Sequence, residues 1–351
     1  MTSDNFKKIP ALRGLLNFLF SVGLAALFLY LAFSDVNFGE VMELVSQASL
    51  IWVVVFSVAI LLGHYVRALR WKYILYSVKP DVKMWNLFGA LMIGYGVNCV
   101  TPKLGEVTRA IMIGRYENLS RSSMFGTVIV ERVIDIISLG CAVVISAFIW
   151  RASLYETFPW LEITLYISAI GLAAVLLMIY LSVMFKEKFY GYFLKFIGKF
   201  SEKLAERLAY IFEMLIQGFT SLKGTKNYVL TFLTSVIILI IYAFTSYLGF
   251  FMLDMQSTFN VTFEMGWILM SISAIGVVIP TPGATGSYHA LAKSTLVLLF
   301  GFGETISAAY AFLTHIISYF LFIIVALIMY FVLDKQHSGI FNIFKINSDD
   351  Q

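Results

Sequence analysis

Charged side chains in this chain lie close together at positions where the flanking sequence is apolar. There are two such groups of three charged residues. The first comprises Lys103, Glu106 and Arg109, and the second comprises Glu131, Arg132 and Asp135. Within each group the spacing of three or four residues brings side chains to one face of a helix, where they can form ion pairs. Because an ionisable residue at membrane depth costs about 3 kcal/mol or more, such residues usually face a partner or a water-filled cavity. These groups therefore predict either a structural ion-pair network or a polar site.

A third group of basic residues lies at the end of an apolar run, in the order Arg67, Arg70 and Trp71. The planar fork of an arginine guanidinium matches a phosphate group, so Arg67, Arg70 and Arg109 are candidates for binding one. One alternative is that Arg67, Arg70 and Trp71 only anchor a span at the membrane interface. Another is that the arginines only pair with carboxylates to hold the helices together.

Near the C-terminus a glycine-rich turn precedes two histidines. Gly283 and Gly286 permit a tight turn, and His289 and Lys293 follow one helical turn apart. The run lacks the Gly-Lys-Ser/Thr ending of a nucleotide-binding P-loop. His315 lies near the middle of the last apolar run. It could be a hydrogen-bonded interior histidine or part of a proton relay, and the sequence is compatible with both roles.

The same dipeptide interrupts two apolar stretches. Thr101-Pro102 and Thr281-Pro282 are 180 residues apart. Proline breaks a helix, and inside a bilayer the freed backbone groups need protein or a water-filled cavity to satisfy them. Broken helices at matching positions of two repeats are typical of a transport site.

The composition places the chain in a membrane. Of its 351 residues 60% are hydrophobic and only 13% are charged, and the mean hydropathy is +0.86. Several runs reach the roughly 20 apolar residues that cross a bilayer. We expect full spans at 12–33, 48–69, 124–150, 163–185, 228–253 and 304–333. The two cysteines lack metal-ligand spacing, so we expect no metal site. We also expect no other cofactor and no nucleic-acid partner.

The loop charges predict how these spans are oriented. Lys7, Lys8 and Arg13 favour a cytoplasmic N-terminus, whereas the loop 34–47 has no Lys or Arg. The same rule is satisfied if segments 84–115 and 265–300 are re-entrant hairpins that enter from opposite faces, which leaves the C-terminus cytoplasmic. We therefore expect one all-α, polytopic membrane domain over 1–351 with about six spans and an inverted repeat of 48–150 and 228–333. The alternative is a chance alignment of spans of similar length.

Residues 186–223 have apolar residues at steps of three and four with lysines between them. This pattern is typical of a basic amphipathic helix on the cytoplasmic membrane surface. A simple connector between the repeats and a segment that attracts anionic lipids are both open.

The combined motifs resemble the lysylphosphatidylglycerol synthase transmembrane-region family, over about residues 10–333. The resemblance is carried by Arg67-x-x-Arg70-Trp71, Asn98-x-x-x-Pro102-x-x-Gly105-Glu106-x-x-Arg109, Glu131-Arg132-x-x-Asp135 and Pro280-x-Pro282-Gly283-x-x-Gly286. It implies a multi-pass membrane protein that moves lipid between leaflets, with both hairpins lining the path of the headgroup. In this interpretation the substrate-binding residues are Arg67, Arg70, Asn98, Arg109, Gly283, Gly286 and His289, and the gating residues are Pro102, Lys103, Glu106, Glu131, Arg132, Asp135 and Pro282.

Two departures from the family pattern matter. Full-length synthases carry an aminoacyl-transferase domain after the membrane region, whereas this chain ends about 18 residues after its last expected span. We therefore do not expect it to catalyse that transfer. His289 stands where the family often has a glutamate, which changes the expected charge of the substrate site.

Three functions are compatible with these residues. The first is a flippase for a phosphate-bearing, anionic lipid in the bacterial inner membrane. The second is a membrane enzyme that acts on a lipid-linked substrate and uses the carboxylates of Glu106, Glu131 and Asp135. The third is a non-catalytic subunit that presents lipid to a partner enzyme. Membrane lipids are the expected partner. The sequence is also compatible with a homo-oligomer and with a lipid-modifying enzyme as a further partner.

Overall fold

The computed structural model describes residues 4–76, 78–150, 170 and 224–337. These residues form ten α-helices and two short 3-10 helices, with no strand among them. The expected all-α class is therefore confirmed. The expected span 163–185, apart from Ile170, and the expected amphipathic connector 186–223 lie outside the described residues.

Five long helices form the frame of the bundle, and their bounds lie within a few residues of the expected spans, except that α1 begins eight residues earlier. They are α1 (Asp4–Phe33), α3 (Leu50–Leu75), α6 (Arg121–Ile149), α10 (Thr225–Met252) and α13 (Glu304–His337). Four of them, α1, α3, α10 and α13, contain a stretch long and apolar enough to cross a membrane. The fifth, α6, carries Glu131, Arg132 and Asp135. At the start of α6 the Ser120 hydroxyl accepts a hydrogen bond from the Ser123 N–H, which satisfies one of the free backbone donors there.

The first broken stretch is a hairpin of two short helices, α4 (Met84–Val100) and α5 (Leu104–Tyr116). The chain turns over Thr101 to Lys103, and Lys103 takes a left-handed conformation with φ of 64°. Close contact between the two limbs requires glycine, because a Cβ on Gly105 would lie 2.0 Å from the Gly94 carbonyl oxygen. The turn is held by the Asn98 side chain, which accepts a 2.7 Å hydrogen bond from the Gly105 N–H.

The second broken stretch is a hairpin of α11 (Phe263–Val278) and α12 (Ser287–Leu298), joined by the 3-10 turn η2 (Pro282–Ala284). Gly283 and Gly286 both have positive φ, at 57° and 86°. A Cβ on Gly286 would lie 2.5 Å from the Ala25 carbonyl oxygen of α1, so this turn packs directly on another helix backbone.

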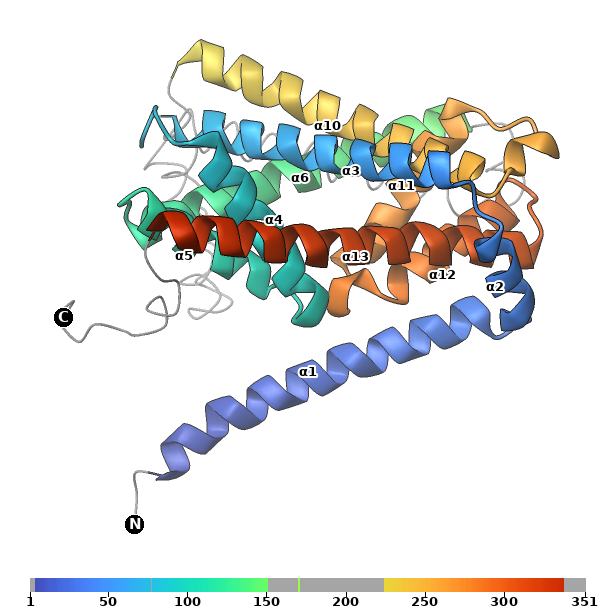
Figure 1. Cartoon of the computed structure of the whole chain (residues 1–351), viewed down its shortest axis with the longest axis horizontal. Coiled ribbons are helices and arrows are strands. Elements are labelled where there is room, and N and C mark those ends of the chain that lie inside the picture. Colours follow the sequence, from blue (N-terminus) through green and yellow to red (C-terminus); the bar gives the residue numbers. More distant parts are fainter. Residues whose placement is uncertain (1–3, 77, 151–169, 171–223, 338–351) are drawn as a thin grey trace.

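The two hairpins enter the bundle from opposite ends, and their tips meet near its middle (Figure 1). At the contact the Tyr319 hydroxyl of α13 donates a 2.8 Å hydrogen bond to the Cys99 carbonyl oxygen. A Cβ on Gly283 would lie 3.4 Å from the Cys99 Cα. The opposed direction is thus a property of the bundle, whereas re-entry with respect to a membrane stays a prediction.

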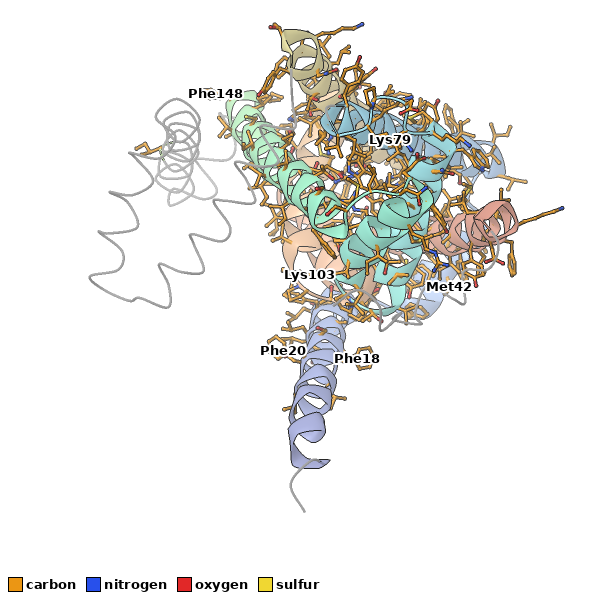
Figure 2. The ribbon with its side chains drawn as sticks, turned by 90° about the vertical axis from the view of Figure 1, so that its left-hand side faces the viewer. Phe18, Phe20, Met42, Lys79, Lys103 and Phe148 are labelled. Carbon is orange, nitrogen blue, oxygen red and sulfur yellow. The ribbon has the colours of Figure 1, made fainter. Side chains whose placement is uncertain are left out.

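The two ends of the bundle differ in charge. One end carries the segments around Lys72, Lys79, Lys83, Arg115 and Lys226, and Figure 2 looks onto it with Lys79 labelled. At the other end, segments 34–49, 253–264 and 299–304 contain acidic residues and no Lys or Arg. We call them the basic end and the acidic end.

Helix α1 separates from the bundle toward its N-terminus, and Phe18 and Phe20 project from it away from the other helices (Figure 2). Only its later half packs on the second hairpin, through Ala25 and the residues after it. The short helix α2 (Phe38–Ser46) follows, and the Asn37 side chain caps it by accepting a hydrogen bond from the Gly39 N–H.

Candidate functional site

A buried network of arginines and carboxylates joins the first hairpin to α3 and α6. Glu131 is its centre and has no exposed surface. Its two oxygens accept from Arg67 Nε at 2.7 Å and from Arg109 Nη1 at 2.6 Å. The predicted network of Glu131, Arg132 and Asp135 is therefore present, and it extends to helices that sequence spacing alone could not include.

Arg67 and Arg70 are held by both carboxylates. Each donates to Asp135, and Arg70 Nη2 also lies 3.4 Å from Glu131 Oε1. Arg70 Nη1 donates to the Ser235 hydroxyl of α10 at 3.2 Å, which ties a fourth helix to the network. The two arginines are 6% and 1% exposed, so the interpretation of Arg67 and Arg70 as interfacial anchors is wrong.

Arg109 uses only part of its hydrogen-bonding capacity. Its Cζ lies 4.9 Å above the centroid of the Trp71 ring, a cation–π arrangement that fixes the plane of the guanidinium. Trp71 has no exposed surface, and its Nε1 donates to the Thr127 hydroxyl at 3.1 Å. The Nε and Nη2 of Arg109 are buried and have no hydrogen-bond partner among the described residues. Buried donors of this kind usually bond to a water molecule or a ligand.

Arg132 is held more loosely than the other three arginines. Its guanidinium lies 3.5 Å from Asp135, 3.6 Å from Glu131 and 3.8 Å from Glu106, all longer than a good hydrogen bond. Its side chain is 38% exposed, and its Nε lacks a partner in the part of the chain that the structure covers. Arg132 can therefore change partners with little loss of existing bonds.

A small pocket lies on the first hairpin between these two arginines. Its polar lining comprises Tyr95, Asn98, Glu106, Arg109 and Arg132. It has room for about one water molecule, so a ligand could enter it only after the lining side chains move apart. Within the described part of the chain, Glu106 is held by Asn98 Nδ2 at 3.3 Å and by the more distant Arg132.

The charges of the pocket and the network favour an anion. Four arginines face three carboxylates, Glu106, Glu131 and Asp135, so the formal balance is +1. A tetrahedral oxyanion can accept from the unpaired donors of Arg109 and can displace Glu106 from Arg132. The arrangement is thus suited to binding a phosphate group.

The second hairpin contributes a neutral, aromatic site. His289 is 3% exposed, and its ring centroid lies 4.5 Å from that of His315 on α13. The His289 Nδ1 accepts from the Gly286 N–H at 3.2 Å, and His315 Nε2 lies 3.2 Å from the Thr285 hydroxyl. Lys293, which sequence spacing places one turn from His289, pairs with Glu304 at 2.8 Å.

Of the remaining predicted residues, Lys103 and the two prolines lie apart from the charge network, and Glu106 lies at its edge. We expected Lys103 to share a helix face with Glu106 and Arg109. It lies instead at the N-cap of α5, with its side chain exposed. Pro102 and Pro282 form the hairpin turns. Glu106 pairs with Arg132 rather than with Arg109. Among the described residues, no group of three or more His, Cys, Asp or Glu could hold a metal ion.

Sequence reasoning missed Tyr319, which closes the contact between the tips, and Glu117 at the basic end. Glu117 accepts from Asn86 Nδ2 at 2.8 Å, from the Lys83 N–H at 3.2 Å and pairs with Lys79 at 2.8 Å. Burial alone would raise the pKa of Glu117, but the hydrogen bonds from Lys79, Asn86 and Lys83 outweigh it and lower that pKa. Nothing in the local sequence of Glu117 signals these partners.

Comparison with known proteins agrees with this architecture. The family model of the lysylphosphatidylglycerol synthase TM region matches residues 18–326. A UPF0104 membrane protein of Methanothermobacter thermautotrophicus is 34% identical over 28% of this chain and 30% of its own length. The UPF0104 membrane protein MJ1595 of Methanocaldococcus jannaschii is 33% identical over 19% of this chain and 20% of its own. The chain thus matches less than a third of either relative, and no solved structure matches it.

Proposed function

Because the chain belongs to the lysylphosphatidylglycerol synthase TM region family, we propose that it moves a phosphate-bearing, anionic lipid between the leaflets of the cell membrane. The observation that carries this proposal is Arg109, whose Nε and Nη2 have no partner among the described residues where the side chain lines the pocket. A phosphate group supplies the missing acceptors. The lipid tails would stay in the bilayer, and the lining of the pocket would have to open for the phosphate group to enter, because the closed pocket has room for about one water molecule.

The opposed hairpins support a path rather than a single binding site. The pocket of the first hairpin and the histidine pair of the second lie on either side of the contact between Cys99, Gly283 and Tyr319. In the proposed cycle this contact is the closed gate. The headgroup binds to Arg109 and Arg132, Glu106 is displaced, and separation of the tips lets the headgroup pass toward the second hairpin.

The orientation follows from the charges of the two ends. Cytoplasmic loops carry an excess of Lys and Arg, so the basic end would face the cytoplasm and both termini would lie there. The two broken hairpins would then be re-entrant from opposite faces, and the units 48–150 and 228–333 would form an inverted repeat. The pocket on the first hairpin would accept lipid from the cytoplasmic side.

The test is the translocation of a labelled anionic phospholipid in vesicles reconstituted with the full chain. Arg109→Lys keeps the positive charge but removes the fork and its two free donors. We expect at least a tenfold slower translocation with this variant, because one lost charged hydrogen bond costs about 1.5–3 kcal/mol. Arg115→Lys is the matched control, because Arg115 is exposed on the same helix. Equal rates for Arg109→Lys and Arg115→Lys, with both proteins folded, would refute the phosphate assignment.

A further inference from the structure

The histidine pair of the second hairpin contains two imidazoles with different hydrogen-bonding freedom. A backbone N–H can only donate, so the Gly286 N–H fixes His289 Nδ1 as an acceptor. Neutral His289 must then carry its proton on Nε2. Protonation of Nδ1 would break this bond and leave two donors facing each other.

The position of His289 in its helix also disfavours a positive charge. It is the third residue of α12, in the first turn, where the helix dipole is positive and the backbone N–H groups point outward. Its bond to Gly286 satisfies the backbone N–H of the N-cap residue and orders the start of the helix. His289 is therefore held neutral by a structural role.

His315 has a partner that accommodates both of its charge states. Its Nε2 lies 3.2 Å from the Thr285 hydroxyl, which can rotate to donate to a neutral imidazole or to accept from an imidazolium. The ring centroids of Tyr288 and Tyr319 lie 5.7 Å and 5.9 Å from that of His315, within the range at which aromatic faces attract a cation. His315 is also partly exposed, whereas His289 is 3% exposed.

The other groups around the pair do not compete for the proton. Helix α1 contributes the Phe33 ring, which has no titratable group. Lys293 of α12 is bound to Glu304 of α13 at 2.8 Å, so these charges compensate each other. Tyr288 bonds with the Thr314 hydroxyl, and Tyr319 donates to the carbonyl of Cys99 on the first hairpin.

We propose that His315 binds the proton that accompanies transport, and that His289 positions the turn and stays neutral. The charge on His315 would act on the contact between the two tips through Tyr319. The ring of Tyr319 faces His315, and its hydroxyl donates to the Cys99 carbonyl. The link to transport rests on the proposed lipid translocation, whereas proton binding by His315 can be measured on the isolated protein.

The first test is nitrogen NMR of the histidine-labelled full chain, which has four histidines, between about pH 4 and 8. Single His→Gln variants assign the signals. We expect the His315 signal to titrate and the His289 signal to remain that of the neutral Nε2–H form. Thr285→Val should lower the protonated fraction of His315 at each pH, and Thr285→Ser, which keeps the hydroxyl, should not. Titration of His289, or no titration of His315, overturns the proposal.

The second test separates proton binding from translocation. In reconstituted vesicles the wild-type rate should change by up to about tenfold per pH unit, the limit for one coupled proton. The rate with Thr285→Val should lose that dependence, and the rate with Thr285→Ser should keep it. A pH-independent wild-type rate contradicts the coupling. If wild type moves no lipid at all, the proposed function fails, while the NMR result still decides whether His315 binds a proton.

Discussion

The two hairpins have the same shape but are held by different forces. The first packs against α3 and α6 through four arginines and three carboxylates, of which Arg67, Arg70, Arg109 and Glu131 are buried. In the second, glycine backbones contact α1 and α13 closely, and His289, Thr285 and Ser287 make hydrogen bonds without net charge. A headgroup phosphate would thus meet a charged pocket on one side of the gate and a titratable, aromatic one on the other.

This difference shows how two hairpins of similar shape can make the two ends of a transport path chemically different. Matching breaks after Thr101 and Thr281 produce two similar hairpins, but only the first retains spare cationic donors. A site with fixed charge binds an anion at any pH near neutral, whereas a histidine site changes its charge with pH. The following predictions test this comparison, beginning with the largest effect.

Glu131→Gln should destabilise the first hairpin most. Arg67 and Arg109 would each lose a charged acceptor in the interior, and breaking a buried ion pair costs about 3–5 kcal/mol. The free energy of unfolding in mild detergent measures this loss. Glu43→Gln, at an exposed position of α2, should leave it unchanged. A wild-type value for Glu131→Gln would mean that the network does not hold this hairpin.

Gly283→Ala should destabilise the second hairpin through close packing. Both Gly283 and Gly301 have positive φ, so alanine at either position costs about 1–2 kcal/mol in backbone conformation. At Gly283 the new Cβ would also lie 2.7 Å from the Tyr319 ring, whereas at Gly301 nothing lies within 4 Å. We expect Gly283→Ala to cost about 1–3 kcal/mol more than Gly301→Ala in thermal unfolding. Equal losses would show that the tip contact is loose.

Arg132→Gln should separate binding from stability within the first hairpin. Because Arg132 is 38% exposed and makes only long ion pairs, its removal should cost no more than about 1 kcal/mol. Binding of an anionic phospholipid, measured by native mass spectrometry, should nevertheless weaken. Arg67→Gln should lower the free energy of unfolding by several times as much as Arg132→Gln does. A similar loss of stability in both variants would contradict the assignment of Arg132 as a loosely held ligand.

Glu117→Gln should have the smallest and most pH-dependent effect. Because the folded protein lowers the pKa of Glu117 below its ordinary value of 4.5, the ionised group stabilises the fold above that pH. This stabilisation is lost as the pH falls through the lowered pKa. The difference in melting temperature between wild type and Glu117→Gln should thus be largest near neutral pH and shrink below about pH 4. A difference that is constant with pH would show that the ionised carboxylate is not the stabilising species.

The pattern of apolar runs predicted most of the fold, because a membrane helix is defined by local composition. The breaks at Pro102 and Pro282 and the short limbs on either side were also readable, since proline acts on its own backbone. The ion-pair partners were only partly predictable. Arg132 and Asp135 are neighbours on one helix, but the bonds from Arg67 and Arg109 to Glu131 depend on how helices pack. Tyr319 and Thr285 could not be found from sequence, because their roles exist only where the two tips meet.

The most direct test of the account is to lock the two tips together. In a Cys141→Ala background, Gly283→Cys places a thiol beside the native Cys99, since a Cβ at position 283 lies 3.4 Å from the Cys99 Cα. The measurement is translocation of a labelled anionic phospholipid before oxidation, after oxidation, and after reduction, with Cys99→Ser as the control. If the headgroup passes between the hairpins, cross-linking should reduce translocation to the rate of protein-free vesicles, and reduction should restore it. Unchanged translocation with the tips cross-linked would contradict the account.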